Sequence, residues 1–288
     1  MPTYREVLNI NEKYALDNFK EDSGVKLLLL HFSKLSNADL LLSMDQQFSE
    51  VEYKEFLYGV DRYVTQNIPV QHIIGYEYFY GHKFVVSQDV LIPRYETEEL
   101  VANVLMMYDD VFDGQEVEVL DLGTGSGCLG VTLDLEEMHM KVTATDISDE
   151  ALHTAKLNND NLGASVTFFQ GDWYQPIQGK KYDIIVSNPP YIPKNEYVED
   201  LVVDNEPGIA LFGGEDGLEY YRTIISNAKE HLKDRFIIAF EHAYDKADEV
   251  VLEEVYYSVG GGFIATEKEL KKELKKELKK ELKGDDKA

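Results

Sequence analysis

Apolar residues recur every three or four positions along the first 65 residues, which is the spacing of helices with one buried face. Pro69 is expected to end the last of these helices, and Ser36 and Asn37 precede a run with an acid in its first turn, as at a helix start. We therefore expect a small helical N-terminal domain over residues 1–70. Its predicted helices are 4–18, 25–34, 37–44 and 47–65.

The pattern changes after residue 70. Residues 71–93 are rich in Tyr, Phe, Val and Ile and contain Gly75 and Gly81, so we predict a hairpin or short strands within a β-rich connector at 71–96. Helical spacing returns at 97–108, and from residue 116 onward short apolar strands alternate with helices. The predicted strands are 118–122, 141–146, 165–170, 182–187 and 235–241. The predicted helices are 128–138, 149–162, 217–232 and 245–257.

Three strands of this second region carry short apolar runs, at 119–120, 184–186 and 236–238. Such strands are typically buried on both faces, and when helices separate them they form a parallel sheet with right-handed crossovers. The expected fold is α/β, a doubly wound and mostly parallel sheet with the small helical domain in front of it. The catalytic domain is expected at 97–266. The Glu-Leu-Lys-Lys repeats at 267–288 form a low-complexity tail, for which we predict a solvated helix.

Charge and cysteine content exclude several classes of protein. The formal net charge is −26, and because residues 267–288 hold nine Lys and seven acids, residues 1–266 carry −28. Such a chain repels polyphosphates and anionic lipids unless it has a local basic patch. A single cysteine, Cys128, and scattered histidines exclude a disulfide framework and predict no metal site. No apolar run is long enough to span a bilayer and the N-terminus has no signal core, so we expect a cytoplasmic protein without a membrane partner.

A glycine-rich loop follows the first strand of the α/β region. Its glycines allow a tight turn and a close approach of the backbone to a ligand, next to the free N–H groups of a helix start. Gly125, Gly127 and Gly130 match a dinucleotide-binding pattern, and Asp146 ends the next strand, where an acid can bind a ribose. Dinucleotides and S-adenosylmethionine both carry that ribose, so Asp146 does not discriminate between them. The candidate cofactor-binding residues of the loop are Gly123, Thr124, Gly125, Ser126 and Gly127.

Two further candidates follow the third strand. Asp172 and Trp173 stand at the point of a doubly wound sheet where side chains face the ligand crevice. Asp172 can accept a hydrogen bond from an adenine amino group, and Trp173 can cover the ring. The alternative for Trp173, the only tryptophan, is that of an aromatic residue in the core or at its rim.

The fourth strand ends in Asn188, Pro189, Pro190 and Tyr191. Two successive prolines have no N–H groups, so no sheet ladder passes through them and their carbonyls stay available as acceptors. With the side-chain carbonyl of Asn188 and the flat face of Tyr191, they form a receptor for a planar NH₂ group. Holding both N–H bonds aims the lone pair of a poor nucleophile at an electrophile and stabilises positive charge that develops on nitrogen. These four residues are therefore the candidate catalytic and substrate-binding residues.

These motifs carry a resemblance to a known family. With Asp121 closing the strand before its glycines, the loop resembles that of class I S-adenosylmethionine-dependent methyltransferases, and Asn-Pro-Pro-Tyr resembles those that modify amino nitrogen. Up to about residue 257, the chain looks most similar to the bacterial release factor glutamine methyltransferases. The more specific marks are Leu-Ile-Pro-Arg-Tyr-Glu-Thr-Glu at 91–98, Glu-Pro at 206–207, Gly-Gly-Glu-Asp-Gly-Leu at 213–218 and Tyr-Arg at 221–222.

The resemblance implies a function. The cofactor would be S-adenosyl-L-methionine, in contact with the glycine loop, Asp146, Trp173 and Asn188. Asn188 to Tyr191 would bind the glutamine of the Gly-Gly-Gln motif in peptide chain release factors, which is methylated at N5. Arg94 and Glu98 would have a structural role and tie the connector to the catalytic domain. The partner would be the release factor, without direct contact to nucleic acid, and the chain a monomer.

Other functions remain open at this point. An adenine-N6 nucleic-acid methyltransferase shares Asn-Pro-Pro-Tyr but needs a basic groove and base flipping, which the acidic body disfavours. A ribosomal-protein glutamine methyltransferase is hardly separable by motif. A dinucleotide-dependent dehydrogenase would leave Asn188 to Tyr191 unexplained. A non-catalytic binding module would be the result if the altered C-terminus had cost the protein its activity. The family ends with two more strands, whereas residues 256–265 here lead directly into the repeats, so we expect one weak edge strand at most.

Overall fold

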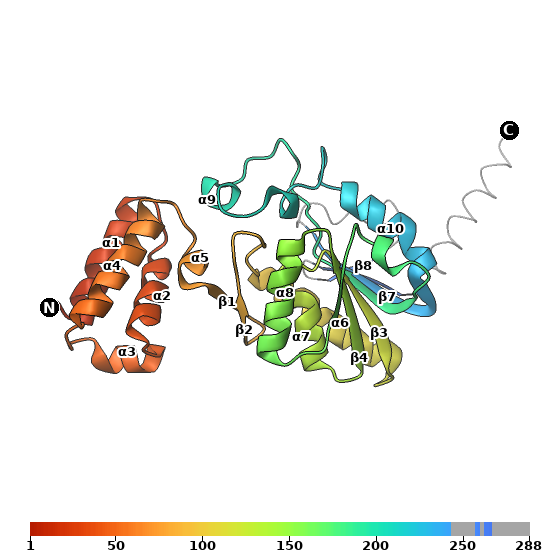
Figure 1. Cartoon of the computed structure of the whole chain (residues 1–288), viewed down its shortest axis with the longest axis horizontal. Coiled ribbons are helices and arrows are strands. Elements are labelled where there is room, and N and C mark those ends of the chain that lie inside the picture. Colours follow the sequence, from red (N-terminus) through yellow and green to blue (C-terminus); the bar gives the residue numbers. More distant parts are fainter. Residues whose placement is uncertain (243–256, 260–261, 267–288) are drawn as a thin grey trace. The chain divides into compact units, whose positions relative to one another are not determined.

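The computed structural model describes residues 1–242, 257–259 and 262–266. Contacts divide the chain into two compact units, and Figure 1 labels most of their helices and several of their strands. The first unit contains Met1–Tyr76 together with Val198–Asn205, and the second contains Glu77–Tyr197 and the chain from Glu206 onward.

Helices make up the first unit. The four helices predicted from the apolar spacing are confirmed, and serine or threonine residues cap three of them. Thr3 forms a capping box with Glu6, while the hydroxyls of Ser36 and Ser49 each accept from the backbone N–H three residues on. The helices of the unit are α1 (Tyr4–Asp17), α2 (Asp22–Ser33), α3 (Asn37–Ser43), α4 (Glu50–Val64), α5 (Val70–Ile74) and α9 (Asp200–Val203).

The expected role of Pro69 is wrong. Helix α4 ends at Val64, and Pro69 is instead the N-cap of the short helix α5, which lies where strands were predicted. Asn67 adopts a left-handed backbone conformation with φ +56°, so the chain has already turned away before the proline. Proline fits at the start of a helix because the N–H that it lacks has no partner there.

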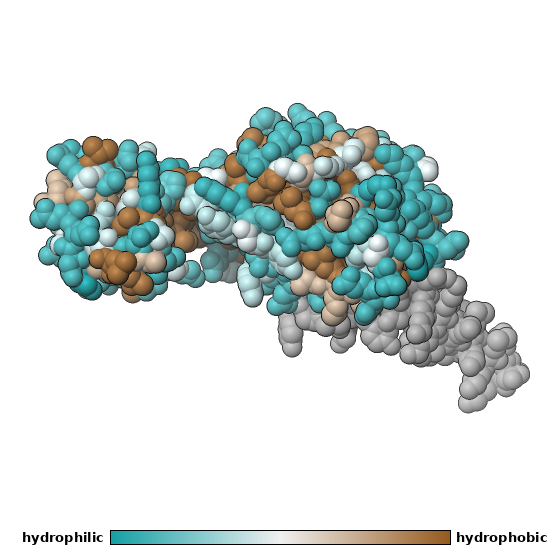
Figure 2. All heavy atoms as spheres, turned by 90° about the horizontal axis from the view of Figure 1, so that it is seen from below, coloured by the Kyte–Doolittle hydropathy of each residue, from teal (hydrophilic) through white to brown (hydrophobic). Residues whose placement is uncertain are grey.

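Two glycines let the helices of the first unit pack closely. A Cβ at Gly24 would lie 2.8 Å from the ring of Tyr63, and one at Gly59 would lie 2.6 Å from Phe32. The unit buries its own apolar cluster, which includes Val25, Leu28 and Phe56. Its surface also carries apolar side chains, part of the brown area on the left of Figure 2. The exposed ones include Ile10, Leu16, Phe19, Leu41, Leu42, Val51 and Tyr58.

The strands β1 (Tyr76–Phe79) and β2 (His82–Val85) form a two-stranded sheet, which belongs to the second unit from Glu77 onward and confirms the predicted hairpin. A seven-stranded sheet follows in the order β5-β4-β3-β6-β7-β9-β8, with β3 to β7 parallel, which confirms the predicted doubly wound α/β fold. Its strands are β3 (Val117–Leu122), β4 (Met140–Asp146), β5 (Thr167–Gln170), β6 (Tyr182–Ser187), β7 (Leu232–Glu241), β8 (Tyr257–Val259) and β9 (Gly262–Thr266).

Helices cover both faces of this sheet. Alternate residues of one strand enter two different apolar clusters: Ile184 and Val186 of β6 join the cluster of α6 and α7, whereas Ile185 joins that of α10. Burial on both faces explains the apolar runs of the inner strands β3, β6 and β7. The helices are α6 (Tyr95–Phe112), α7 (Cys128–Glu136), α8 (Asp149–Leu162) and α10 (Glu219–His231), and two short 3₁₀ turns lie at Gln175–Ile177 and Gly208–Ala210.

The C-terminal edge of the sheet differs from the prediction. Instead of one weak edge strand there are two, since β9 pairs antiparallel with β7 and β8 pairs antiparallel with β9. The apolar residues on either side of the glycine triplet at 260–262 belong to two pairing strands rather than to one segment. Tyr257, predicted as the end of a helix, begins β8. The rest of that helix, at 245–256, and the tail at 267–288 lie outside the described residues. Within the described ranges, no helix has the length and apolar character that crossing a membrane requires.

Candidate active site

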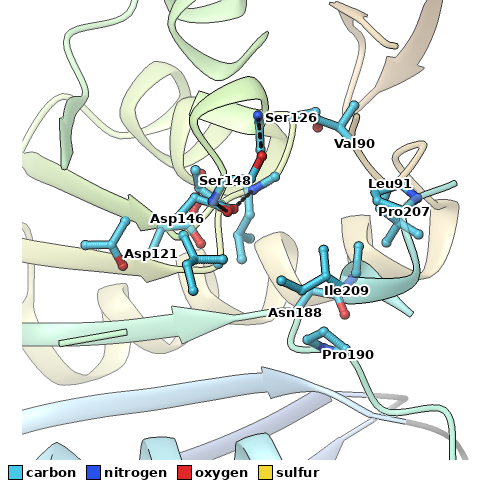
Figure 3. Close-up of a pocket in the computed structure, with 18 of the residues that line it drawn as sticks. Val90, Leu91, Asp121, Ser126, Asp146, Ser148, Asn188, Pro190, Pro207 and Ile209 are labelled. Carbon is cyan, nitrogen blue, oxygen red and sulfur yellow. Dashed lines mark hydrogen bonds between the residues drawn. The ribbon is translucent and has the colours of Figure 1, made fainter. Parts of the chain in front are cut away.

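The carboxyl ends of β3, β4, β5 and β6 meet around one cavity of about 410 Å³, which Figure 3 shows in close-up. The chain order reverses at β3, because β4 pairs on one side of it and β6 on the other. Ligands of open α/β sheets bind at such a switch point. Of the predicted site residues, nine line the cavity: Gly123, Thr124, Gly125, Ser126, Asp146, Asp172, Trp173, Asn188 and Pro190. Gly127, Pro189 and Tyr191 are not in this lining.

Three glycines of the loop after β3 have left-handed backbone conformations, which side chains rarely adopt. Gly125, with φ +56°, has no atom within 4 Å of the position of a Cβ, so its backbone is open to a ligand. Gly127, with φ +83°, serves packing instead, since its Cβ would lie 3.1 Å from that of Ala155 on α8. A Cβ at Gly123 would lie 3.5 Å from the ring of Trp173. The loop therefore combines one open position with two positions of close contact.

Asp146 connects the glycine loop to the loop after β4. Its Oδ2 accepts from the Gly125 N–H at 2.8 Å and its Oδ1 accepts from the Ser148 N–H at 2.9 Å. Burial raises the pKa of Asp146, while the hydrogen bonds from the backbone oppose that rise. A carboxylate has about four acceptor sites, so acceptor capacity remains for the hydroxyls of a ribose.

Asp121 is a buried carboxyl group behind the glycine loop. Its Oδ2 accepts from the Thr124 hydroxyl at 2.6 Å and from the Gly130 N–H at 3.0 Å, and burial raises its pKa to about 7. A Cβ at Gly130 would lie 2.8 Å from that same oxygen. The third glycine of the apparent dinucleotide pattern thus makes room for Asp121. Asp121 holds the loop to helix α7.

Trp173 lines the cavity and also packs against the apolar cluster of α10. Its ring lies 5.2 Å from that of Tyr220, between centroids, at an interplanar angle of 48°. Its backbone has φ +42°, and the Thr145 hydroxyl donates to its carbonyl oxygen at 3.2 Å. Asp172, next to it, is exposed and lines the same cavity. The two residues form one wall of the cavity, in which the ring of Trp173 lies next to the glycine loop.

Asn188 follows the last residue of β6. Its Nδ2 donates to the hydroxyl of Thr97 on α6 at 3.2 Å. Pro189 is buried, and Tyr191 is half-buried against the cluster of α10, with its hydroxyl 3.5 Å from Oε1 of Glu241. In Figure 3, Asn188 and Pro190 lie across the cavity from Asp146 and Ser148.

The glycine-rich loop at 213–218 holds this motif in place. A Cβ at Gly213 would lie 2.4 Å from the carbonyl oxygen of Pro190, and one at Gly217 would lie 2.3 Å from that of Tyr191. The Ile192 N–H donates to the Leu211 carbonyl at 3.0 Å, and the Gly213 N–H donates to the Ile192 carbonyl at 2.9 Å. Only glycine lets the two backbones approach this closely.

The connector is tied to the loop before residue 213 by a buried acid. Both oxygens of Glu206 are used: the Arg94 Nη2 donates to Oε1 at 2.5 Å, and the Ile92 N–H donates to Oε2 at 2.9 Å. Glu98 accepts from the Tyr80 N–H at 2.7 Å. These contacts agree with the structural role expected for Arg94 and Glu98, although Arg94 also reaches the cavity.

Sequence reasoning missed part of the cavity wall. The motifs at 91–98 and 206–207 were identified, but nothing in their residue types indicated that they face a ligand. The lining residues of α10, which are Glu219, Tyr220 and Thr223, carried no signal, since they lie far along the chain from the glycine loop. The missed residues include Asp89, Val90, Leu91, Pro93, Thr97, Pro207, Ile209, Ala210, Glu219, Tyr220 and Thr223.

The charge of the lining fits one cofactor better than the other. Among the described residues it contains five acids, namely Asp89, Asp121, Asp146, Asp172 and Glu219, and a single base, Arg94. Such a wall repels the pyrophosphate of a dinucleotide and attracts the cationic sulfonium of S-adenosylmethionine. With an open glycine, acceptors left on Asp146 and the indole of Trp173, the residues present fit S-adenosylmethionine.

Comparison with known proteins points the same way. Residues 101–206 match the methyltransferase small domain and residues 15–75 match the PrmC N-terminal domain. The release factor glutamine methyltransferase of Bacillus subtilis is 43% identical over 247 residues, 84% of this chain and 85% of that protein. The one from Koribacter versatilis is 46% identical over 241 residues, 82% of this chain and 84% of that protein.

A solved structure of a methyltransferase from Pyrococcus furiosus is 16% identical, with a TM-score of 0.47 over 76% of this chain and 99% of that one. The fold, the family matches and the named relatives define an S-adenosylmethionine-dependent N-methyltransferase of class I. More narrowly, the chain belongs to the release factor glutamine methyltransferase family.

Proposed function

We propose that this protein transfers a methyl group from S-adenosylmethionine to N5 of the glutamine in the Gly-Gly-Gln motif of peptide chain release factors. The observation that carries the proposal is the position of Asn188. Its Nδ2 is engaged by Thr97 at 3.2 Å, on the cavity that the glycine loop also lines, so its Oδ1 remains to accept from a target amide. Relatives that carry the release factor name are similar along more than four fifths of the chain.

The chemistry asks little of the protein beyond placement. S-Adenosylmethionine, when bound, supplies a methyl group on a positively charged sulfur. A carboxamide nitrogen is a poor nucleophile because its lone pair is delocalised, so Asn188 Oδ1 and the Pro189 carbonyl accept its two N–H bonds and aim that lone pair. The same acceptors stabilise the positive charge that develops on nitrogen, and one N–H proton then leaves to water.

On this proposal the cofactor contacts come from four loops. The glycine loop at 123–127 approaches with its backbone, Asp146 accepts from the ribose hydroxyls, and Asp172 and Trp173 receive the adenine. Asn188 lies between cofactor and substrate, while Pro190 and Tyr191 complete the substrate side. The positions of Asp146 and Asn188 on opposite walls in Figure 3 support this assignment.

We also propose roles for the parts of the chain. Residues 1–70 would recognise the protein substrate, because exposed apolar side chains such as Leu41, Leu42 and Val51 are common at protein interaction sites. Residues 71–96 would connect them to the methyltransferase domain at 97–266. The enzyme would act as a cytoplasmic monomer without direct contact to nucleic acid or membrane, in keeping with its formal charge of −26.

A competition assay tests the proposal. The protein is incubated with S-adenosylmethionine labelled on the methyl group and with a release factor, the same factor with its Gly-Gly-Gln glutamine replaced by alanine, ribosomal proteins and DNA. Label is expected on the intact release factor alone. Label on a ribosomal protein would change the substrate, and label on DNA would favour the adenine-N6 alternative.

A further inference from the structure

A buried carboxyl group lies behind the Asn-Pro-Pro-Tyr motif, and the chemistry derived above does not use it. Glu241 is the last residue of β7 and only 4% exposed. The Tyr191 hydroxyl lies 3.5 Å from its Oε1, and the Tyr221 hydroxyl donates to its backbone carbonyl at 2.6 Å. Within the described residues, its Oε2 has no hydrogen-bond partner. A buried carboxyl group with a spare acceptor exerts a strong local influence, because little water screens it.

Glu241 faces the residues that hold the substrate motif. Burial raises its pKa, and hydrogen bonding from Thr97, Asn188 and Tyr191 opposes that rise. Thr97, Asn188 and Tyr191 are thus the polar neighbours of this carboxyl group, and the Tyr191 hydroxyl lies within hydrogen-bond distance of its Oε1. Thr97 is 2% exposed, and its hydroxyl accepts the hydrogen bond from Asn188 Nδ2. Thr97, Asn188 and Glu241 therefore form one connected group of side chains.

The direction of these hydrogen bonds decides which end of Asn188 meets the substrate. The Thr97 hydroxyl has a single proton, and when that proton points to Glu241 its oxygen can only accept. The NH₂ end of Asn188 is then required at Thr97, and the carbonyl end faces the cavity. A flipped amide would set its oxygen against the Thr97 oxygen and a buried carboxylate, and would offer the target NH₂ a donor instead of an acceptor.

We propose that Thr97 and Glu241 are positioning residues that fix the orientation of the Asn188 carboxamide, so that its oxygen accepts from the substrate NH₂ group. The inference rests on the proposed function and adds the means by which the acceptor is set. Neither residue touches the reacting atoms. The sequence gives no sign of the group, because its members lie on α6, on the loop after β6 and on β7.

A pair of threonine variants tests the proposal. Thr97→Val keeps the shape of the side chain but removes the hydroxyl. The kcat for a release factor is expected to fall by about tenfold to a hundredfold. This loss approaches the one that follows removal of a polar group that stabilises a transition state directly. The Kd for S-adenosylmethionine is expected to stay within about twofold of wild type, because Thr97 acts through Asn188. Thr97→Ser restores the hydroxyl and is expected to restore most of kcat.

Thr132→Val is the matched control. Thr132 is fully buried on α7, and among the described residues its hydroxyl has no hydrogen-bond partner. This variant makes the same chemical change away from the cavity, and kcat is expected to be unchanged. If Thr97→Val keeps its kcat within twofold, or if it loses cofactor affinity and activity together, the proposed positioning role is wrong.

A measurement without substrate separates this inference from the proposed function. In nitrogen-15 NMR spectra, the side-chain NH₂ signals of Asn188 are assigned by their loss in Asn188→Asp. They are expected to exchange slowly with solvent in the wild type, and to shift and exchange faster in both Thr97→Val and Glu241→Gln. Signals that do not respond to either change would overturn the inference. A wild-type enzyme that transfers no methyl group to glutamine would overturn the function and leave this result standing.

Discussion

The loop after β3 and the loop after β6 end neighbouring parallel strands, yet they present opposite hydrogen-bonding groups to the same cavity. The first is made of glycines, and its open backbone offers N–H groups and close approach. The second is made of prolines, which have no N–H and offer carbonyls. The difference teaches that one sheet edge can bind two ligands side by side when adjacent loops differ in the donors and acceptors of their backbone.

The two loops are also held in different ways. Asp121 holds the first loop in place by accepting hydrogen bonds from the Thr124 hydroxyl and from the backbone N–H of Gly130. The second loop is held by the backbone of residues 213–218, which packs against it so closely that only glycine fits at Gly213 and Gly217. Substitutions in the first loop should therefore affect mainly the cofactor, and substitutions around the second mainly transfer.

The sharpest test of this difference is Asn188→Ala. It removes a substrate acceptor from the second loop, and kcat is expected to fall by about a thousandfold, as when a key polar group of a transition state is lost. The melting temperature should change little, and kcat is measured with labelled cofactor. Asn227→Ala, which removes an exposed asparagine on α10, should keep full activity. Full activity of Asn188→Ala would mean that the second loop does not receive the amide.

Next in size is the effect of Gly217→Ala. The new Cβ would collide with the Tyr191 carbonyl at 2.3 Å, at a residue with φ +80°, so the free energy of unfolding should fall by about 3 kcal/mol. Denaturation in urea measures the change. Gly163→Ala has a similar φ of +76° but open space around the Cβ, and it should cost only about 1 kcal/mol. Equal losses in the two variants would show that the close approach has no energetic weight.

Asp146→Asn addresses the first loop. The variant keeps one acceptor but loses the charge, and the affinity for S-adenosylmethionine should fall by about tenfold to thirtyfold, the usual worth of one charge-assisted hydrogen bond. Calorimetry measures it. At saturating cofactor, kcat should recover to near the wild-type value, in contrast to Asn188→Ala. If kcat stayed low at saturating cofactor, the assignment of cofactor binding to the first loop and of methyl transfer to the second would be wrong.

The last expected effect concerns pH and is small for each pH unit. Burial raises the pKa of Asp121 to about 7, above the value of about 3.9 for an unfolded chain, so the native state binds the extra proton between these values. Its contribution to stability is complete below about pH 4 and is lost as the pH rises through 7. From pH 5 to 7, the wild type should lose stability relative to Asp121→Asn by about 1 kcal/mol per pH unit. A difference between the two proteins that does not depend on pH would contradict this.

The sequence predicts the central sheet well because inner strands such as β3 and β6 are buried on both faces and carry apolar runs. It predicts the loop residues for a related reason, since parallel strands bring their carboxyl ends together. The short helix α5 was missed because five residues give too little periodicity, and the pairing of β8 with β9 because apolar residues around glycines do not specify register.

The supports of the site were harder to predict than the site itself. Thr97 and Glu241 lie far apart along the chain, and each is a common residue type in its element. Their proximity depends on the packing of α6 against the end of β7, which no local pattern contains. Glu206 was recognised as part of a motif, but its bond to Arg94 spans 112 positions and emerges only from the fold.

The position of Trp173 gives the protein a built-in optical reporter. The chain contains a single tryptophan, and that residue lines the cavity next to the glycine loop. Light that excites only indole therefore reports on this cavity and on no other part of the molecule. Entry of an adenine ring against Trp173 would change its emission, so ligand binding can be followed in the unlabelled protein.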